Sequence, residues 1–273
     1  RFFIACWIAA LLPAASLSAQ SPVFSQFYAH RPSLNPAYVS AMRGLEITAG
    51  YRRQWGQIQD GFQTAFAAAA LRSCNLPLGW GAYVSDIHEP FFNYRVQEAG
   101  IQAGGFFGSS ERWSLHGGFQ AGLGQHSVDF ARLLFSGQLD PIFGVQGSPA
   151  PYFQQDGSRV QSFEVGVGAV LRSSLLLQNN EWPFSLGLAV HQAGGSRDVS
   201  FLRLAGSRAP RWTAHGALTL PVSGEFATRT VLYLNALTRL EWESGLQRGT
   251  LGLIAQYDAA HFGFLYQFNR QPY

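Results

Sequence analysis

Lysine is absent from this 273-residue chain, and charged residues of every kind are scarce. They make up 13% of the sequence, and the 19 basic and 16 acidic side chains give a formal net charge of +3. An ordinary globular domain contains about a quarter charged residues, so a surface that faces only water is disfavoured. The arginines are scattered along the chain, and we therefore expect no nucleic-acid partner.

Cysteines and long apolar runs are also rare. The two cysteines are Cys6 and Cys74, and the longest apolar run lies within residues 1–20, between a basic start and a small-residue end. This pattern predicts a secretory signal peptide over residues 1–19. A membrane anchor is disfavoured because the run is shorter than the roughly 20 residues that a spanning helix needs. Removal of the leader would take Cys6 with it, so no internal disulfide is expected.

Apolar residues are abundant, but small and polar residues dilute them. Hydrophobic residues account for 47% of the chain and aromatic residues for 14%, yet 30 glycines and many polar residues keep the mean hydropathy at +0.01. Membrane helices would raise that value well above zero. Strands with one face toward lipid and the other toward a wet lumen produce this composition.

The stretch 112–128 shows the underlying period of two most clearly. A period of two indicates a strand with one apolar and one polar face, and this run exceeds the about 9–11 residues that a tilted strand needs to cross a bilayer. The apolar positions are Trp113, Leu115, Phe119, Ala121 and Leu123, and the small or polar ones between them are Ser114, His116, Gly118, Gln120, Gly122, Gly124 and His126.

Similar segments recur to the end of the chain and predict an all-β fold, an antiparallel up-and-down transmembrane β-barrel of the bacterial outer membrane. Single-chain bacterial barrels have even strand numbers, so we expect about 12 strands, with 11 visible and a C-terminal one missing. The alanine-rich segment 62–72 shows no clear faces. A soluble sandwich is disfavoured because its outer faces would be too apolar. The expected strands are 45–55, 62–72, 78–85, 93–105, 112–125, 160–172, 183–191, 211–220, 230–240, 249–258 and 261–269.

Residues 20–44 differ from the rest because they contain three prolines and do not alternate. Pro32 and Pro36 are incompatible with a helix interior or a central strand, and the aromatic residues around them favour burial. We therefore expect an N-terminal arm packed in or under the barrel, with residues 45–273 forming the barrel itself.

The connections between the expected strands are unequal. If the first strand runs outward, the two longest connections, 126–159 and 192–210, lie on the outer side, as in outer-membrane barrels, and would be exposed at the cell surface. Loop 126–159 is too apolar for a disordered tail, so it either folds into the lumen as a plug or presents a patch to a partner. Its candidate partner-binding residues are Phe130, Leu134, Phe135, Ile142, Phe143, Tyr152 and Phe153.

The histidine and charged residues, which often act in catalysis or metal binding, are expected to have structural roles in this chain. The histidines on or near inward positions lack metal-ligand spacing, and no G-x-S-x-G motif is present, so we expect no metal, no cofactor and no enzymatic activity. We expect the histidines to fill the lumen with polar groups, and the acidic and basic residues to form a lumen ion-pair network or to line a wet pore. The histidines are His88, His116, His126, His191 and His215, and the charged residues are Glu46, Arg52, Glu164, Arg239 and Glu241.

The segment from residue 24 to residue 69 contains three short motifs. They are Phe24, Ser25, Gln26 and Phe27; Leu34, Asn35, Pro36, Ala37 and Tyr38; and Tyr51, Arg52, Gln54 and Trp55. Together they resemble the opening of the PorP/SprF family of type IX secretion system membrane proteins, and further similarity lies at 78–90 and 123–133. The resemblance implies an outer-membrane barrel that assists export or surface attachment of type IX cargo, including adhesins of gliding bacteria, with other type IX components as partners.

Two other functions stay open at this point. A passive porin-like channel for small solutes would need an open lumen, whereas an outer-membrane enzyme would need His, Ser and acidic side chains gathered at one rim of the barrel.

Overall fold

The computed structural model describes much of the chain between residues 27 and 270. The expected signal peptide and the start of the arm lie outside the described residues. Among the described residues, no helix is both long and apolar enough to span a membrane. The described residues are 27–42, 44–57, 61–90, 93–109, 113–129, 139–140, 142, 144–145, 159–177, 180–192, 210–222, 232–243, 246–258 and 260–270.

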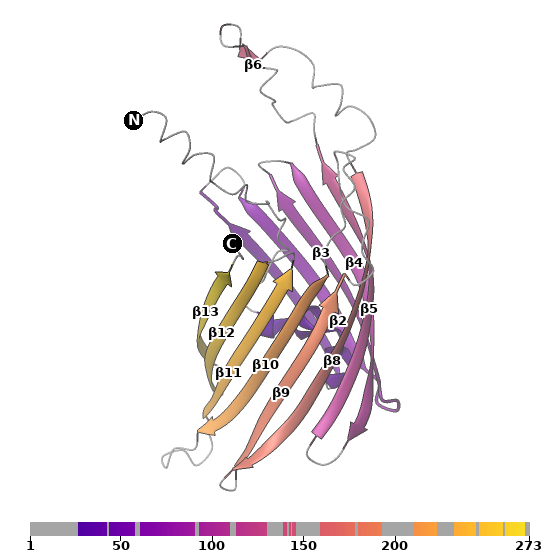
Figure 1. Ribbon diagram of the computed structural model, residues 1–273, viewed down its shortest axis with the longest axis vertical. Helices are drawn as coiled ribbons and strands as arrows, with labels where there is room; N and C mark the ends of the chain where they lie inside the picture. The colour runs from indigo at the N-terminus through magenta and orange to yellow at the C-terminus, as the bar shows by residue number, and fades with distance from the viewer. Residues whose placement is uncertain are drawn as a thin grey trace, which may run out of the picture.

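Eleven antiparallel strands form one sheet in which each strand pairs with its neighbours along the chain, and the sheet curls into a barrel wall (Figure 1). This confirms the predicted up-and-down transmembrane β-barrel. The end strands, β1 and β13, are not paired with each other within the described residues, and no twelfth strand of this sheet is among them. The strands are β1 (Leu45–Gln54), β2 (Phe62–Arg72), β3 (Leu78–Glu89), β4 (Tyr94–Ser109), β5 (Trp113–Val128), β8 (Arg159–Leu177), β9 (Asn180–His191), β10 (Arg211–Val222), β11 (Leu232–Glu243), β12 (Leu246–Tyr257) and β13 (Ala260–Arg270), and a separate two-residue pair is formed by β6 (Leu139–Asp140) and β7 (Gly144–Val145).

Several strands are longer than their side-chain patterns indicate, and the ladders of β8 and β12 show why. β8 continues to Leu177 because its ladder with β9 runs on to the pair Leu177–Asn180. β12 begins at Leu246 rather than Gly249, because Leu246 pairs with Glu243 of β11. The connection expected at 241–248 is therefore only the two residues 244 and 245.

The alternation predicted from the sequence decides which side chains face lipid. Leu123, Leu188 and Phe262 are 67–72% exposed on the outer face of the wall, where lipid replaces water in an outer-membrane barrel. Even the alanine-rich β2 has two faces, since Thr64 and Ala70 are buried inside and Leu71 is exposed outside. Exposed tryptophans lie on the outer face near the two ends of the strands, where outer-membrane barrels carry aromatic girdles: Trp55, Trp80, Trp113, Trp212 and Trp242.

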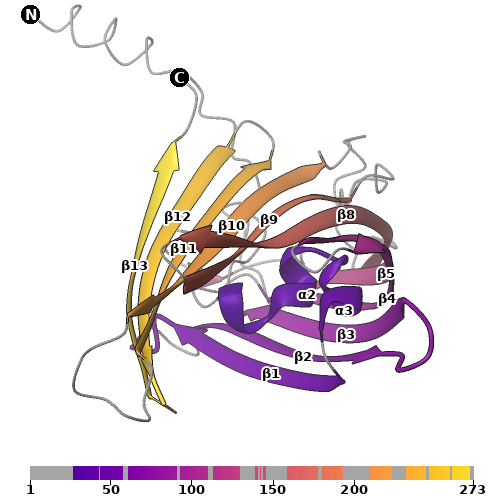
Figure 2. The ribbon, with the colours of Figure 1, turned by 90° about the horizontal axis from the view of Figure 1, so that it is seen from below.

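The buried core lies inside the barrel, where three short helical turns occupy the concave side of the sheet (Figure 2). They are η1 (Phe27–Ala29), α2 (Arg31–Leu34) and α3 (Tyr38–Ala41). Pro32 stands in the first turn of α2, where its missing N–H costs nothing. The core cluster comes mostly from this arm, with Ala70 and Val170 from the wall; its arm members are Phe27, Leu34, Ala37, Tyr38, Val39, Ala41 and Met42.

Candidate functional site

A row of glycines crosses the inner face of the wall beneath the arm. Gly79 of β3 pairs with Gly104 of β4, Gly104 pairs with Gly118 of β5, and Gly118 pairs with Gly168 of β8. Directly opposed residues of an antiparallel sheet point to the same face. Four adjacent strands therefore present a continuous path without side chains, called here the glycine row.

The arm lies directly on this row, backbone against backbone. A Cβ atom at Gly118 would collide with the main chain of Pro36 and Ala37, and one at Gly79 would collide with the carbonyl of Val39. At Gly104 the added atom would lie 2.8 Å from Cγ2 of Val39. Only glycine permits so close an approach, so the row is the seat that positions the arm.

Asn35 attaches the arm to three strands. Its Nδ2 atom donates to the carbonyl oxygens of Ala169 on β8 and Leu188 on β9, both at 3.0 Å, and lies 3.2 Å from Nε2 of His215 on β10. Its Oδ1 atom accepts the backbone N–H of Ala37 at 3.0 Å. Both ends of this fully buried amide are therefore satisfied.

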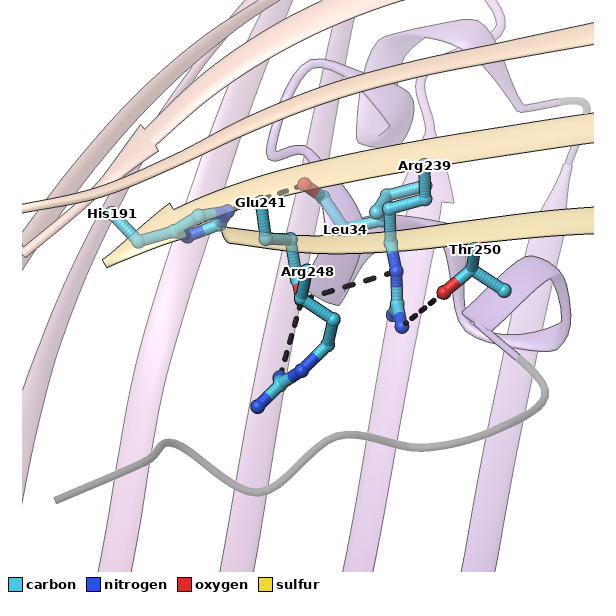
Figure 3. Close-up of polar contacts among 6 residues, drawn as sticks. All are labelled: Leu34, His191, Arg239, Glu241, Arg248 and Thr250. Carbon is cyan, nitrogen blue, oxygen red and sulfur yellow. Dashed lines mark hydrogen bonds and ion pairs between the residues drawn. The ribbon is translucent and has the colours of Figure 1, made fainter. Parts of the chain in front are cut away.

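Wall side chains in turn donate to the carbonyl groups of the arm. Gln102 donates to Pro32 O at 2.9 Å, and Arg172 donates to Ala41 O at 2.7 Å. The ring Nε2 of His191 lies 3.2 Å from Leu34 O, which can only accept (Figure 3). These bonds satisfy carbonyl groups that short helical turns leave without internal partners, so the wall holds the arm at three points between Pro32 and Ala41.

Tyr38 and Ser40 complete the seat on opposite sides of α3. The Tyr38 ring stacks on His215 with centroids 5.3 Å apart, and burial raises the pKa of the Tyr38 hydroxyl against the opposing charges of Arg31 and Arg172. The Ser40 hydroxyl lies 3.1 Å from Nδ1 of His116 and 3.2 Å from the carbonyl oxygen of Gly105.

Wall strands β11 and β12 carry a buried charge cluster, defined here as Arg239, Glu241 and Arg248 (Figure 3). Glu241 Oε2 lies 3.3 Å from Arg248 Nη1 and 4.0 Å from Arg239 Nε, while Arg239 also donates to Thr250 Oγ1 at 3.3 Å. The Arg239 guanidinium stands 4.7 Å above the ring of Phe27. The cluster therefore borders the first residues of the described arm.

The cluster contains two of the five residues predicted for a lumen ion-pair network. Glu164 accepts a hydrogen bond from Gln192 at 3.4 Å, and Glu46 and Arg52 occupy inward positions on β1. Arg248 precedes the strand expected at 249–258, so side-chain alternation does not predict its inward position. The ladder between β11 and β12 instead places it on a strand, paired with Glu241.

Four of the five predicted lumen histidines are buried on the inner face, and His88 is half-buried. Those four are His116, His126, His191 and His215. Within the described part of the chain, no three His, Cys, Asp or Glu residues are grouped so that they could hold a metal ion. A further buried histidine, His30 of the arm, was not predicted; it packs against Phe66 with ring centroids 4.8 Å apart. Burial lowers the pKa of His30 to about 4.

Two cavities lie against the arm and differ in charge. The larger, of about 620 Å³, lies at the end of the wall where strands are joined by the short connections, and Arg31, Arg72 and Arg172 line it. The smaller, of about 140 Å³, is lined by three carboxylates as well as arginines. Its titratable residues are His30, Tyr83, Glu98, Glu164, His191, Arg211, Arg239 and Glu241.

The predicted motif residues fall into three places. The core of the motif, Leu34 to Tyr38, is the buried part of the arm. Tyr51 lies near the C-terminal end of β1 and Trp55 directly follows the strand; they are 65% and 67% exposed, whereas Arg52 and Gln54 face inward. Phe24, Ser25 and Gln26 lie outside the described residues. Of the candidate partner-binding residues, Ile142 is 83% exposed, and Phe130, Leu134, Phe135, Phe143, Tyr152 and Phe153 lie outside the described residues.

Solved structures and one family model match this chain, and two of the structures are autotransporter domains. The beta domain of the Bordetella autotransporter BrkA shares 13% identity, with 83% of this chain and 92% of that chain covered and a TM-score of 0.44. The translocator domain of the autotransporter NalP from Neisseria meningitidis shares 13% identity, with 83% of each chain covered and a TM-score of 0.37. No curated protein matches the sequence.

The family described as "Type IX secretion system membrane protein PorP/SprF" matches residues 16–223. This range contains the arm, the glycine row and the strands from β1 to β10. It covers well over half of the chain. The chain belongs to the PorP/SprF family of type IX secretion system membrane proteins.

Proposed function

We propose that this outer-membrane protein is a non-enzymatic component of the type IX secretion or gliding apparatus that assists export or surface attachment of cargo such as adhesins. The observation that carries the proposal is the family membership. The seat of the arm supports it, because fixed main chain occupies part of the lumen that a passive channel would leave open. The family match lends no support to a passive porin.

The outer connections are the proposed contact surface for cargo. Connections 129–158 and 192–210 are much longer than those at the other end, such as 73–77 and 178–179, and long loops in outer-membrane barrels face the outside. Ile142 lies in the longest connection and is 83% exposed. An exposed apolar side chain of this kind suits a partner-binding patch, which the other apolar residues of that loop would extend.

Crosslinking in native outer membranes, followed by affinity purification of this protein, tests the proposal. We expect the wild-type protein to recover a type IX cargo domain or another type IX component. Ile142→Arg places a charge in the proposed patch, and we expect it to lower that recovery by about tenfold, the effect of losing one buried apolar contact and desolvating a charge.

Leu76→Arg is the matched control, because Leu76 is 57% exposed in a short connection at the opposite end of the barrel. It should leave recovery unchanged. Recovery of no type IX protein by the wild type would contradict the proposed function. Equal loss in both variants would contradict the outer patch and leave the family role intact.

A further inference from the structure

The larger cavity beside the arm is called here the basic cavity, because its charged lining residues are all basic although the chain as a whole has similar numbers of acidic and basic residues. Arginines and histidines line it, and none of the described residues that line it is an aspartate or a glutamate, although the chain contains 16 acidic residues. The smaller cavity on the other side of the arm has three carboxylates. The positive charge is therefore local to one side of the arm.

Three guanidinium groups come to the basic cavity from different elements. Arg31 belongs to α2 of the arm, Arg72 ends β2, and Arg172 lies on β8. The charges of Arg31 and Arg172 both act on Tyr38. Arg31 and Arg172 are exposed and Arg72 is half-buried, so all three are accessible to a molecule that enters.

Neighbouring groups of the protein orient two of these arginines. Arg172 donates to Ala41 O at 2.7 Å, and the guanidinium of Arg72 lies 5.5 Å from the centroid of the Phe106 ring. Guanidinium groups held in this way are suited to binding a carboxylate through paired N–H donors.

The remaining lining indicates the kind of molecule that carries the anion. Aromatic and aliphatic side chains form much of the wall, among them Phe27, Leu34, Phe106 and Leu237. A bare phosphate ion would leave this apolar surface uncovered, whereas apolar side chains of a peptide would cover it. The volume of about 620 Å³ lies within the usual range of ligand pockets.

The position of the basic cavity indicates the side from which a ligand would come. Arg72 immediately precedes the short connection 73–77, and Trp113 follows the short connection 110–112. Short connections of outer-membrane barrels face the periplasm, and the exposed Cys74 stands at the same end.

We propose that the basic cavity binds an acidic polypeptide segment, carrying both carboxylate and apolar side chains, from a partner protein on the periplasmic side. This site is separate from the outer loops proposed to contact cargo, so either proposal can fail without the other.

The test uses the full-length mature protein in detergent micelles and a short fluorescent peptide that alternates aspartate with phenylalanine. We expect saturable binding by fluorescence anisotropy that weakens as salt increases. The same peptide with asparagine in place of aspartate should bind at least about tenfold more weakly, because charge-assisted hydrogen bonds are lost.

The double variant Arg31→Gln and Arg72→Gln should weaken aspartate-peptide binding at least about tenfold. Arg53→Gln is the matched control, since Arg53 is exposed on β1 near the opposite end of the wall, and it should bind as the wild type does. Heat-modifiable migration in gels verifies that each variant is folded. Where the double variant does not fold, the comparison of the two peptides on wild-type protein still decides the proposal.

An environment-sensitive fluorophore on Cys74 locates the bound peptide. Its emission should shift when the aspartate peptide binds, whereas the same fluorophore on Gly56→Cys in a Cys74→Ser background should not respond. Equal binding of the two peptides, or unchanged binding by the double variant, would overturn the proposal. Displacement of the peptide by phosphatidylglycerol micelles at far lower concentration than by unlabelled peptide would assign the basic cavity to a lipid headgroup and would also overturn it.

Discussion

The two walls of the lumen are filled in different ways. Along β3, β4, β5 and β8 the inner face carries glycines without side chains, and the main chain of the arm fills the space. Along β11 and β12 the wall supplies its own filling, the charge cluster of Arg239, Glu241 and Arg248. The first wall buries hydrogen-bonded amides, and the second buries charges.

This difference predicts how each wall responds to substitution. A backbone seat fails when any atom is added, because neither main chain can move away from the other without breaking its ladder or its turn. A buried charge cluster fails when one charge is removed, because the desolvated partners lose their compensation. Adding a methyl group should therefore destabilise the protein at the glycine row, whereas removing a charge without changing the side-chain shape should destabilise it at the charge cluster.

Glu241→Gln should have the largest effect. The substitution keeps the shape of the side chain but removes the negative charge between two buried guanidinium groups, at a cost of about 3–5 kcal/mol in the free energy of unfolding. Urea unfolding in lipid vesicles measures it. Glu46→Gln on the half-buried inner face of β1 is the control, with an expected cost below about 1 kcal/mol. If the two substitutions lowered the free energy of unfolding equally, the negative charge of Glu241 would not be needed to compensate the two buried arginines.

Gly118→Ala should come next. The added methyl group collides with the main chain of Pro36 and Ala37, and overpacking of this kind costs about 1–3 kcal/mol. Displacement of the arm should also raise single-channel conductance in planar bilayers. Gly166→Ala is the matched control, because it lies on the inner face of β8 beside the glycine row and its added atom has no neighbour nearer than 3.3 Å. Conductance that rises equally in both variants would contradict the seat.

The smallest expected effect is the pH dependence due to His30. Burial lowers its pKa from 6.5 to about 4, so the folded protein resists protonation that the unfolded chain accepts. The contribution of neutral His30 to the free energy of unfolding is complete above pH 6.5 and is lost as the pH falls toward 4. The loss between pH 7 and pH 5 is about 2 kcal/mol. The difference in unfolding free energy between wild type and His30→Phe, measured at both pH values, isolates this group.

The carboxylates and basic groups that share the smaller cavity with His30, among them Glu164 and His191, are present in both proteins. The effect of their titration on the free energy of unfolding therefore cancels when wild type and His30→Phe are compared. A difference that does not change between the two pH values would contradict a buried neutral His30.

The local pattern of side chains predicted the strands and their lipid-facing sides well, because alternation depends only on neighbours along the chain. Trp113 and Leu123 lie on the outer face, as the alternation in the stretch 112–128 predicts, for this reason. Strand ends were less predictable. β12 begins at Leu246 because of its ladder with β11, and no residue of its own marks that start.

The contacts of the arm were beyond prediction. The sequence contains Asn35 and His215, but nothing in it shows that residues 180 positions apart come within 3.2 Å of each other. The glycine row depends in the same way on the register of four strands.

The sequence by itself therefore determined a barrel of alternating strands preceded by a proline-rich segment, since period and composition are local properties. Only the tertiary structure decided where that segment sits and why it stays there. Strand register aligns glycines that are distant along the chain, and this alignment gives the arm its seat.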